Sequence, residues 1–189
     1  MMGGEMVVGS LDYIEHSVRT GNGFGKAFGI SLFDWLVNHP AEASLFNQAM
    51  VGIHGAEPAA VATAYDFSGF DTIADVGGST GNLFTTILDR HAGPDGTLFD
   101  MPHLVRDAPA LLRGCLSDRI RIEAGSFFES VPTGADAYIL SHIIHDWSEE
   151  QCLLMLGNCR RAMSPHRRLL LIEMLRPAGT RRIQGRCSI

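Results

Sequence analysis

The sequence lacks the features that mark membrane and secreted proteins. No apolar run in its 189 residues approaches the ~20 residues that a membrane span requires, and Met1–Glu5 lacks the basic start of a secretory signal. Cysteine is scarce: Cys115, Cys152, Cys159 and Cys187 form no C-x-x-C pair. Cys152 and Cys159 lie seven positions apart in a helical pattern, which is typical of buried thiols rather than zinc ligands. We therefore expect a soluble protein of the reducing cytoplasm, without a membrane partner.

Basic side chains are also scarce over most of the chain. The first 150 residues hold 7 basic and 20 acidic side chains, whereas the remainder holds 8 basic side chains and one acid, Glu173. An acidic body does not suit a nucleic-acid backbone. The pair Arg160 and Arg161 falls in the last turn of a predicted helix, where cations suit the helix dipole, and no aromatics are interleaved for base stacking. We expect no nucleic-acid partner.

What is present is an ordinary globular composition, 46% hydrophobic and 19% charged, with a change of pattern near residue 70. Before it, apolar spacing over 11–18, 31–37 and 41–65 predicts helices, and nothing resembles a strand. After it, short apolar runs alternate with helical segments, as in a parallel α/β sheet. The predicted strands are 72–76, 96–99, 119–123, 135–140 and 168–175, and the predicted helices are 83–90, 104–112 and 148–163.

This pattern predicts a helical segment over 1–70, an α/β domain over 71–177 and, since 178–189 has no periodicity, a disordered tail. The last helix is predicted to open with a capping box at Ser148–Gln151. The strand at 168–175 is apolar on both faces except for Glu173, so we expect it between helices inside the sheet.

The sharpest local feature is the glycine turn Gly77-Gly78-Ser79-Thr80-Gly81, which lies between a predicted strand and a predicted helix. The dinucleotide fingerprint G-x-G-x-x-G does not fit its spacing. The nucleophile elbow G-x-S-x-G does fit, in the right context, with Ser79 as nucleophile. A cofactor loop is the third interpretation, since such a turn aims helix amides at a ligand.

Two acids favour the cofactor loop. Asp75 ends the first strand, where it can face a cation, and Asp100 ends the second strand, where an acid holds the two hydroxyls of a ribose. Together they indicate adenosine binding. The alternative for each acid is that it caps the helix that follows.

Two histidines, His142 and His145, follow the fourth predicted strand, at the edge where open α/β sheets bind ligands. Both could be structural, or one could act as a base near neutral pH. We discount a metal, because no further His or Cys stands at matching spacing. Glu173 ends the neighbouring strand and can orient an imidazole; the alternative is that it pairs with an arginine.

Taken together, these residues resemble the S-adenosylmethionine-dependent O-methyltransferases that act on plant phenolics and on bacterial polyketides. The resemblance runs from about Leu11 to Pro177 and stops there. Its motifs are Ser17–Gly21, Leu45–Met50, Asp75–Gly78, Phe99–His103, Gly125–Phe128, His145–Trp147 and Ile172–Glu173. It implies a Rossmann-like class I methyltransferase sheet preceded by a helical segment, with S-adenosylmethionine as cofactor and no metal.

The resemblance also implies the sites. The cofactor would be held by Asp75, Gly77, Gly78, Asp100, Met101, Ser126 and Phe127. His145 would be the general base, held by Glu173, while Asp146, Phe46 and Met50 would contact a small hydroxyl acceptor. For Phe46 and Met50 the alternative is core packing.

The chain departs from the family at Ser79, where a glycine is usual, and at Ser126, where an aspartate usually binds adenine. Family members are homodimers with a helical domain before this region, and their strand order is 3-2-1-4-5-7-6. Because the last two strands are missing here, we expect an incomplete sheet of about five strands, with the fifth strand as a bare edge.

Three functions follow from these features. The first is an O-methyltransferase, the second a fragment that binds the cofactor or pairs through its edge with weak or no turnover, and the third, least favoured, a serine hydrolase using Ser79.

Overall fold

The computed structural model describes residues 5–106, 108 and 116–174. Cys115, Cys187, the tail at 178–189 and the end of the helix predicted at 104–112 lie outside these residues. The described residues fall into two compact units: one is Phe46–Glu173, and the helices up to Leu45 belong to the other. The domain limits at residues 70 and 177 stay predictions. Among the described helices, none has the length and apolarity to cross a membrane.

The N-terminal unit consists of short helices. Asn22 and Ser31 begin the third and fourth, where their side chains accept hydrogen bonds from the backbone N–H groups of Gly25 and Asp34. The rings of Phe24, Phe28 and Trp35 pack together with centroids 4.5–5.8 Å apart. The helices are α1 (Glu5–Leu11), α2 (Ile14–Thr20), α3 (Gly23–Phe28) and α4 (Leu32–Val37).

The segment predicted as helical over 41–65 forms two helices, α5 (Pro40–His54) and α6 (Glu57–Ala64). Gly55 separates them with a φ of +47°, a left-handed conformation that glycine adopts without the steric cost of a Cβ. No strand precedes Thr72 among the described residues, as predicted.

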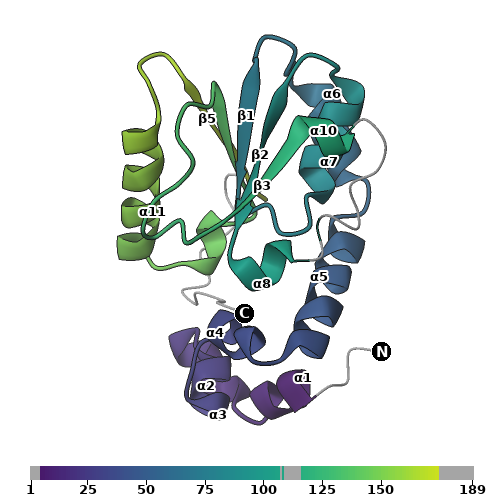
Figure 1. The fold of residues 1–189 in the computed structure, drawn as a ribbon. Coiled ribbons are helices and arrows are strands. Elements are labelled where there is room, and N and C mark those ends of the chain that lie inside the picture. The colour runs from purple at the N-terminus through teal and green to yellow at the C-terminus, as the bar shows by residue number, and fades with distance from the viewer. Residues whose placement is uncertain (1–4, 107, 109–115, 175–189) are drawn as a thin grey trace, which may run out of the picture. The chain divides into compact units, whose positions relative to one another are not determined.

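The larger unit is built on one parallel sheet in the order β3-β2-β1-β4-β5 (Figure 1). The predicted sheet of about five parallel strands, with strand order 3-2-1-4-5, is confirmed in the described residues. Each strand falls at or within two residues of its predicted start. The strands are β1 (Thr72–Val76), β2 (Asp95–Asp100), β3 (Ile120–Ala124), β4 (Ala137–Ser141) and β5 (Arg168–Ile172).

The position of β5 differs from the expectation that this strand lies inside the sheet. Its apolar sequence predicted a place inside the sheet, but in the described residues it pairs with β4 alone and Leu171 is 52% exposed. Burial on both faces requires a neighbouring strand and two covering helices, and the apolar pattern alone does not supply them. The other expectation, that the fifth strand forms an edge of the sheet, is confirmed within the described residues.

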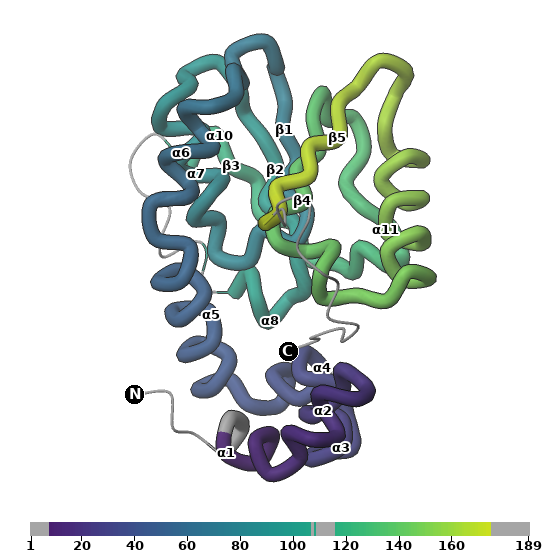
Figure 2. Tube along the Cα trace, turned by 180° about the vertical axis from the view of Figure 1, so that it is seen from behind, coloured from purple at the N-terminus to yellow at the C-terminus, as the bar shows by residue number. Residues whose placement is uncertain are grey.

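The two faces of the sheet bury separate cores. In β4, Ala137 and Ile139 pack with α6 and α7, whereas Tyr138 and Leu140 pack with α11, which follows from the two-residue period of a strand. Figures 1 and 2 show α6 and α7 on one side of the sheet and α11 on the other. The remaining elements are α7 (Asn82–Arg90), α8 (Pro102–Val105), α10 (Leu116–Arg119), the 3-10 turn η1 (Ile144–Asp146) and α11 (Glu149–Ala162).

The capping box of α11 is present as predicted. The Ser148 hydroxyl accepts from the N–H of Gln151, whose side-chain oxygen accepts from the N–H of Ser148. Arg160 and Arg161 lie in its last turn. Cys159 is a buried thiol, as predicted, whereas Cys152, for which the same was expected, is only half-buried.

Candidate functional site

The glycine turn links β1 to α7 at the carboxyl edge of the sheet. Gly77 has a φ of +79°, and a Cβ built on it would lie 2.5 Å from Cδ1 of Ile143. A Cβ on Gly78 would overlap a carboxylate oxygen of Asp75. Neither position accommodates a side chain, so the turn requires glycine at both residues.

Asp75 and Asp100 lie buried at the same edge, only 2% and 3% exposed. Burial raises the pKa of Asp75 to about 7, and the negative charge of Asp100 adds to this rise. Burial also raises the pKa of Asp100 to about 6, against the hydrogen bonds that its carboxylate accepts from the N–H groups of Met101 and Ser79 at 2.7 and 2.9 Å. Two desolvated acids side by side favour a cationic or hydroxyl-rich ligand.

The capping alternative for these acids fails. The N-cap of α7 is Gly81 and that of α8 is Met101, and neither helix has a side-chain cap. Asp75 is buried although it caps neither helix. Its burial therefore has no explanation in helix capping.

Ser79 adopts a left-handed φ of 51°. Its hydroxyl lies 3.5 Å from Oδ1 of Asn47 on α5, and no histidine among the described residues reaches it. The hydrolase interpretation thus lacks its base. Asn47, 8% exposed, was not predicted from the sequence as part of the site; its place in the motif Leu45–Met50 was the available signal.

His145 and Glu173 meet, as the sequence predicted. Nδ1 of His145 donates to Oε2 of Glu173 at 2.7 Å, and Oε1 of Glu173 accepts from the N–H of Ile144 at 2.9 Å. No arginine among the described residues pairs with Glu173. Strand pairing brings the two side chains together, because Ser141 at the end of β4 lies beside Ile172 at the end of β5.

Asp146 lies on the other side of the imidazole. Its Oδ1 is 3.5 Å from Nε2 of His145, and burial raises its pKa although the imidazole lowers it. His145 itself is 52% exposed on its side chain. An imidazole held at Nδ1 by a carboxylate and open to solvent can accept a proton at Nε2.

The other predicted residues lie around these two groups. Phe127 is buried, edge to face against Phe128 and Trp147, and Ser126 accepts from the N–H of Phe128. Met101, Phe46 and Met50 are half-buried. Phe46 and Met50 are outside the buried core, which weakens their core-packing alternative.

An open parallel sheet with a glycine turn after β1, acids ending β1 and β2, and an imidazole–carboxylate pair after β4 and β5 has the arrangement of a class I methyltransferase. The model of the O-methyltransferase domain family matches residues 11–186, so the chain belongs to this family. The match continues past Pro177, so the limit set there by the sequence motifs was too early.

Individual relatives agree with this assignment. Phenazine O-methyltransferase PhzM of Lysobacter antibioticus is 41% identical over 166 residues, which cover 87% of this chain and 49% of the relative. The crystal structure of LaPhzM aligns with a TM-score of 0.88 at 39% identity, covering 95% of this chain and 55% of that one. The chain spans about half the length of the curated relatives it matches.

A third comparison involves a ligand complex. The O-methyltransferase NcsB1 from neocarzinostatin biosynthesis, solved with S-adenosylmethionine and 2-hydroxy-5-methyl naphthoic acid, aligns with a TM-score of 0.79 at 30% identity. The alignment covers 87% of this chain and 51% of NcsB1.

Proposed function

We propose that this chain binds S-adenosylmethionine and supports transfer of its methyl group to a hydroxyl of a small, aromatic metabolite. The observation that carries the proposal is the meeting of two sets of groups at one sheet edge: buried Asp75 and Asp100 beside the glycine turn, and His145 held by Glu173. The complexes of NcsB1 with S-adenosylmethionine support the same cofactor here.

The residues fit this cofactor. The ligand is cationic at sulfur and carries two ribose hydroxyls, and the site offers two desolvated carboxylates whose raised pKa values a nearby cation would lower. The backbone of Gly77 and Gly78 would lie beside its methionine part, Asp100 would hold the ribose, and Met101, Ser126 and Phe127 would border the adenine. When bound, S-adenosylmethionine supplies a methyl group already activated by the sulfonium.

His145 would remove the acceptor's proton. A phenol of pKa ~10 is mostly protonated at neutral pH and is a weak nucleophile, so a nearby base accelerates attack. Glu173 orients the ring and stabilises its protonated form. Asp146, Phe46 and Met50 would hold the acceptor in line with the methyl group. No metal takes part in this account.

Methyl transfer from radiolabelled S-adenosylmethionine to a panel of small phenols tests the proposal. We expect transfer to at least one phenol that saturates with cofactor. Absence of transfer to every phenol, together with absence of cofactor binding, would contradict it.

A cofactor-binding module with little turnover is the second candidate, and the exposed Leu171 on the edge strand β5 favours it. Calorimetric titration separates the two functions. Binding of S-adenosylmethionine without methyl transfer would identify the module, and its pairing through β5 would then appear as self-association that Leu171→Lys reduces.

A further inference from the structure

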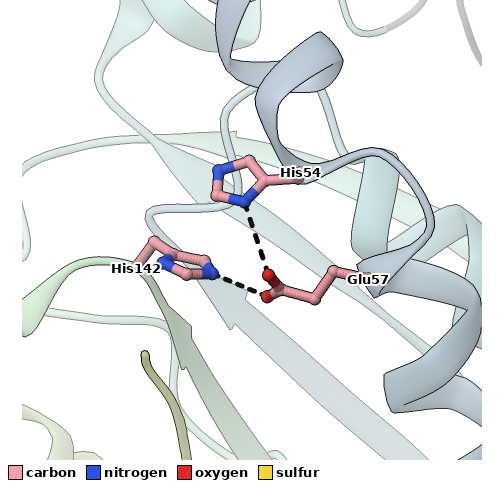
Figure 3. A group of neighbouring side chains, drawn as sticks. All are labelled: His54, Glu57 and His142. Carbon is pink, nitrogen blue, oxygen red and sulfur yellow. Dashed lines mark hydrogen bonds and ion pairs between the residues drawn. The ribbon is translucent and has the colours of Figure 1, made fainter. Parts of the chain in front are cut away.

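Three metal-ligating side chains from distant parts of the sequence face one another in the larger unit. His54 ends α5, Glu57 begins α6, and His142 follows β4. Figure 3 shows the carboxylate of Glu57 directed at both imidazole rings. Nε2 of His142 lies 2.6 Å from Oε1 of Glu57, and Nδ1 of His54 lies 3.8 Å from Oε2. One ligand atom from each residue lies within 4.8 Å of the other two.

The backbone holds His142 in this position at a cost. Its φ of 55° is in the left-handed region, which costs a non-glycine residue about 1–3 kcal/mol. Its side chain is 14% exposed, and its ring lies 4.2 Å from that of His54, centroid to centroid. The imidazole is therefore fixed beside the other two groups before any ligand arrives.

No lysine or arginine among the described residues neutralises Glu57, whose carboxylate meets only the two imidazoles. Two imidazoles and a carboxylate are the donor set that zinc and its neighbours in the first transition row prefer. Donors bound at about 2.0–2.2 Å in a tetrahedral site lie about 3.4 Å apart, a spacing that small rotations of these side chains reach. We propose that His54, Glu57 and His142 bind a divalent ion of the zinc class.

A second set shares one ligand with the first: His142, His145 and Glu173. In that set both oxygens of Glu173 already accept hydrogen bonds, from Nδ1 of His145 and from the N–H of Ile144. A metal ion bound by this second set would have to break the hydrogen bond between His145 and Glu173, the two residues assigned to proton removal. The set with His54 and Glu57 is free of this conflict, and its three ligands leave a fourth position for water or a small ligand.

Spacing along the chain did not predict a metal site, because no further His or Cys stands at matching spacing to His142 and His145. His54 and Glu57 stand close in sequence across the break at Gly55, but the third ligand comes from the loop after β4. Only the fold brings it there. The inference concerns metal binding alone and does not depend on methyl transfer.

Calorimetric titration of the metal-free chain with Zn²⁺, repeated with Co²⁺ while visible absorption is recorded, tests the site. We expect one ion per chain with a dissociation constant of about 10 µM or lower, and a Co²⁺ spectrum typical of tetrahedral coordination. His54→Ala, Glu57→Gln and His142→Asn should each weaken binding at least about tenfold, since even the loss of a group that only orients a ligand costs about 10–100-fold.

The variants are chosen to preserve the fold. Asn tolerates the left-handed backbone of His142, Gln keeps the shape of Glu57, and circular dichroism checks each variant. His16→Ala, which removes a histidine on α2 far along the chain, and Glu173→Gln should leave Zn²⁺ binding unchanged. Absence of saturable binding would overturn the proposal, as would binding that survives His54→Ala and Glu57→Gln but is lost in Glu173→Gln.

Discussion

Nδ1 of His145 donates a hydrogen bond to Glu173 at 2.7 Å, across the ends of the adjacent strands β4 and β5. The second oxygen of Glu173 accepts from the N–H of Ile144, so the carboxylate is fixed to the backbone of the loop that carries the imidazole. This double attachment sets the tautomer of the ring and leaves Nε2 to accept a proton.

Replacement of His145 by alanine should lower kcat for methyl transfer by about 10²–10⁴-fold, the usual contribution of a general base. Affinity for S-adenosylmethionine should stay within about twofold, because the predicted cofactor residues belong to other strands. Initial rates with radiolabelled cofactor and a fixed phenol provide the measurement. His16→Ala serves as the control, and an unchanged rate in His145→Ala would rule out the assigned base.

Glu173→Gln should reduce kcat by at least about tenfold while leaving KM for the cofactor unchanged. The amide keeps the size of the side chain and can still accept from Ile144, but it cannot stabilise a protonated imidazole as a carboxylate does. Steady-state kinetics separate the two parameters. If KM rose and kcat did not fall, Glu173 would be a packing residue instead.

The raised pKa of buried Asp75 should make the stability of the fold decrease as pH rises. Burial raises its folded-state pKa to about 7 from the usual 3.8, so between these values the folded chain retains a proton that the unfolded chain releases. Rising pH through this range therefore destabilises the fold, because the unfolded chain is stabilised by releasing the proton that the folded chain retains.

Asp75→Asn removes this group and provides the comparison. We expect urea denaturation without cofactor to show the variant gaining stability relative to the natural chain as pH rises from 4 to 7. Parallel stability curves for the two proteins would show that Asp75 is ionised in the fold throughout this range.

Gly78→Ala should impair both stability and cofactor binding, because the added Cβ would overlap the Asp75 carboxylate. Gly52→Ala in α5 is the matched control: nothing lies within 4 Å of its Cβ position, and alanine favours a helix. Thermal melts should place Gly78→Ala below the natural chain and Gly52→Ala at or above it. Equal melting temperatures for the two variants would mean that the turn accommodates a Cβ at residue 78 without strain.

Local pattern predicted much of the larger unit. The strands, the capping box of α11 and the meeting of His145 with Glu173 follow from short apolar runs, cap chemistry and the adjacency of sequential strands. These features depend on residues close in sequence or on a rule about parallel sheets, so one sequence suffices to find them.

Other features depend on what the fold brings together. The exposure of Leu171 on β5 depends on which elements pack against this strand, and its apolar sequence alone predicted a buried position. Asn47 reaches Ser79, and His142 reaches Glu57, only because α5 and α6 are positioned against the carboxyl edge of the sheet. The spacing of residues along the chain does not predict these contacts.

The most direct test of the account is calorimetric titration of the chain with S-adenosylmethionine, alongside Asp100→Asn. We predict saturable binding of one ligand per chain, weakened at least about tenfold in the variant because a charged hydrogen-bond partner of the ribose is lost. Absence of binding to the natural chain, or equal affinity in a folded Asp100→Asn variant, would contradict it.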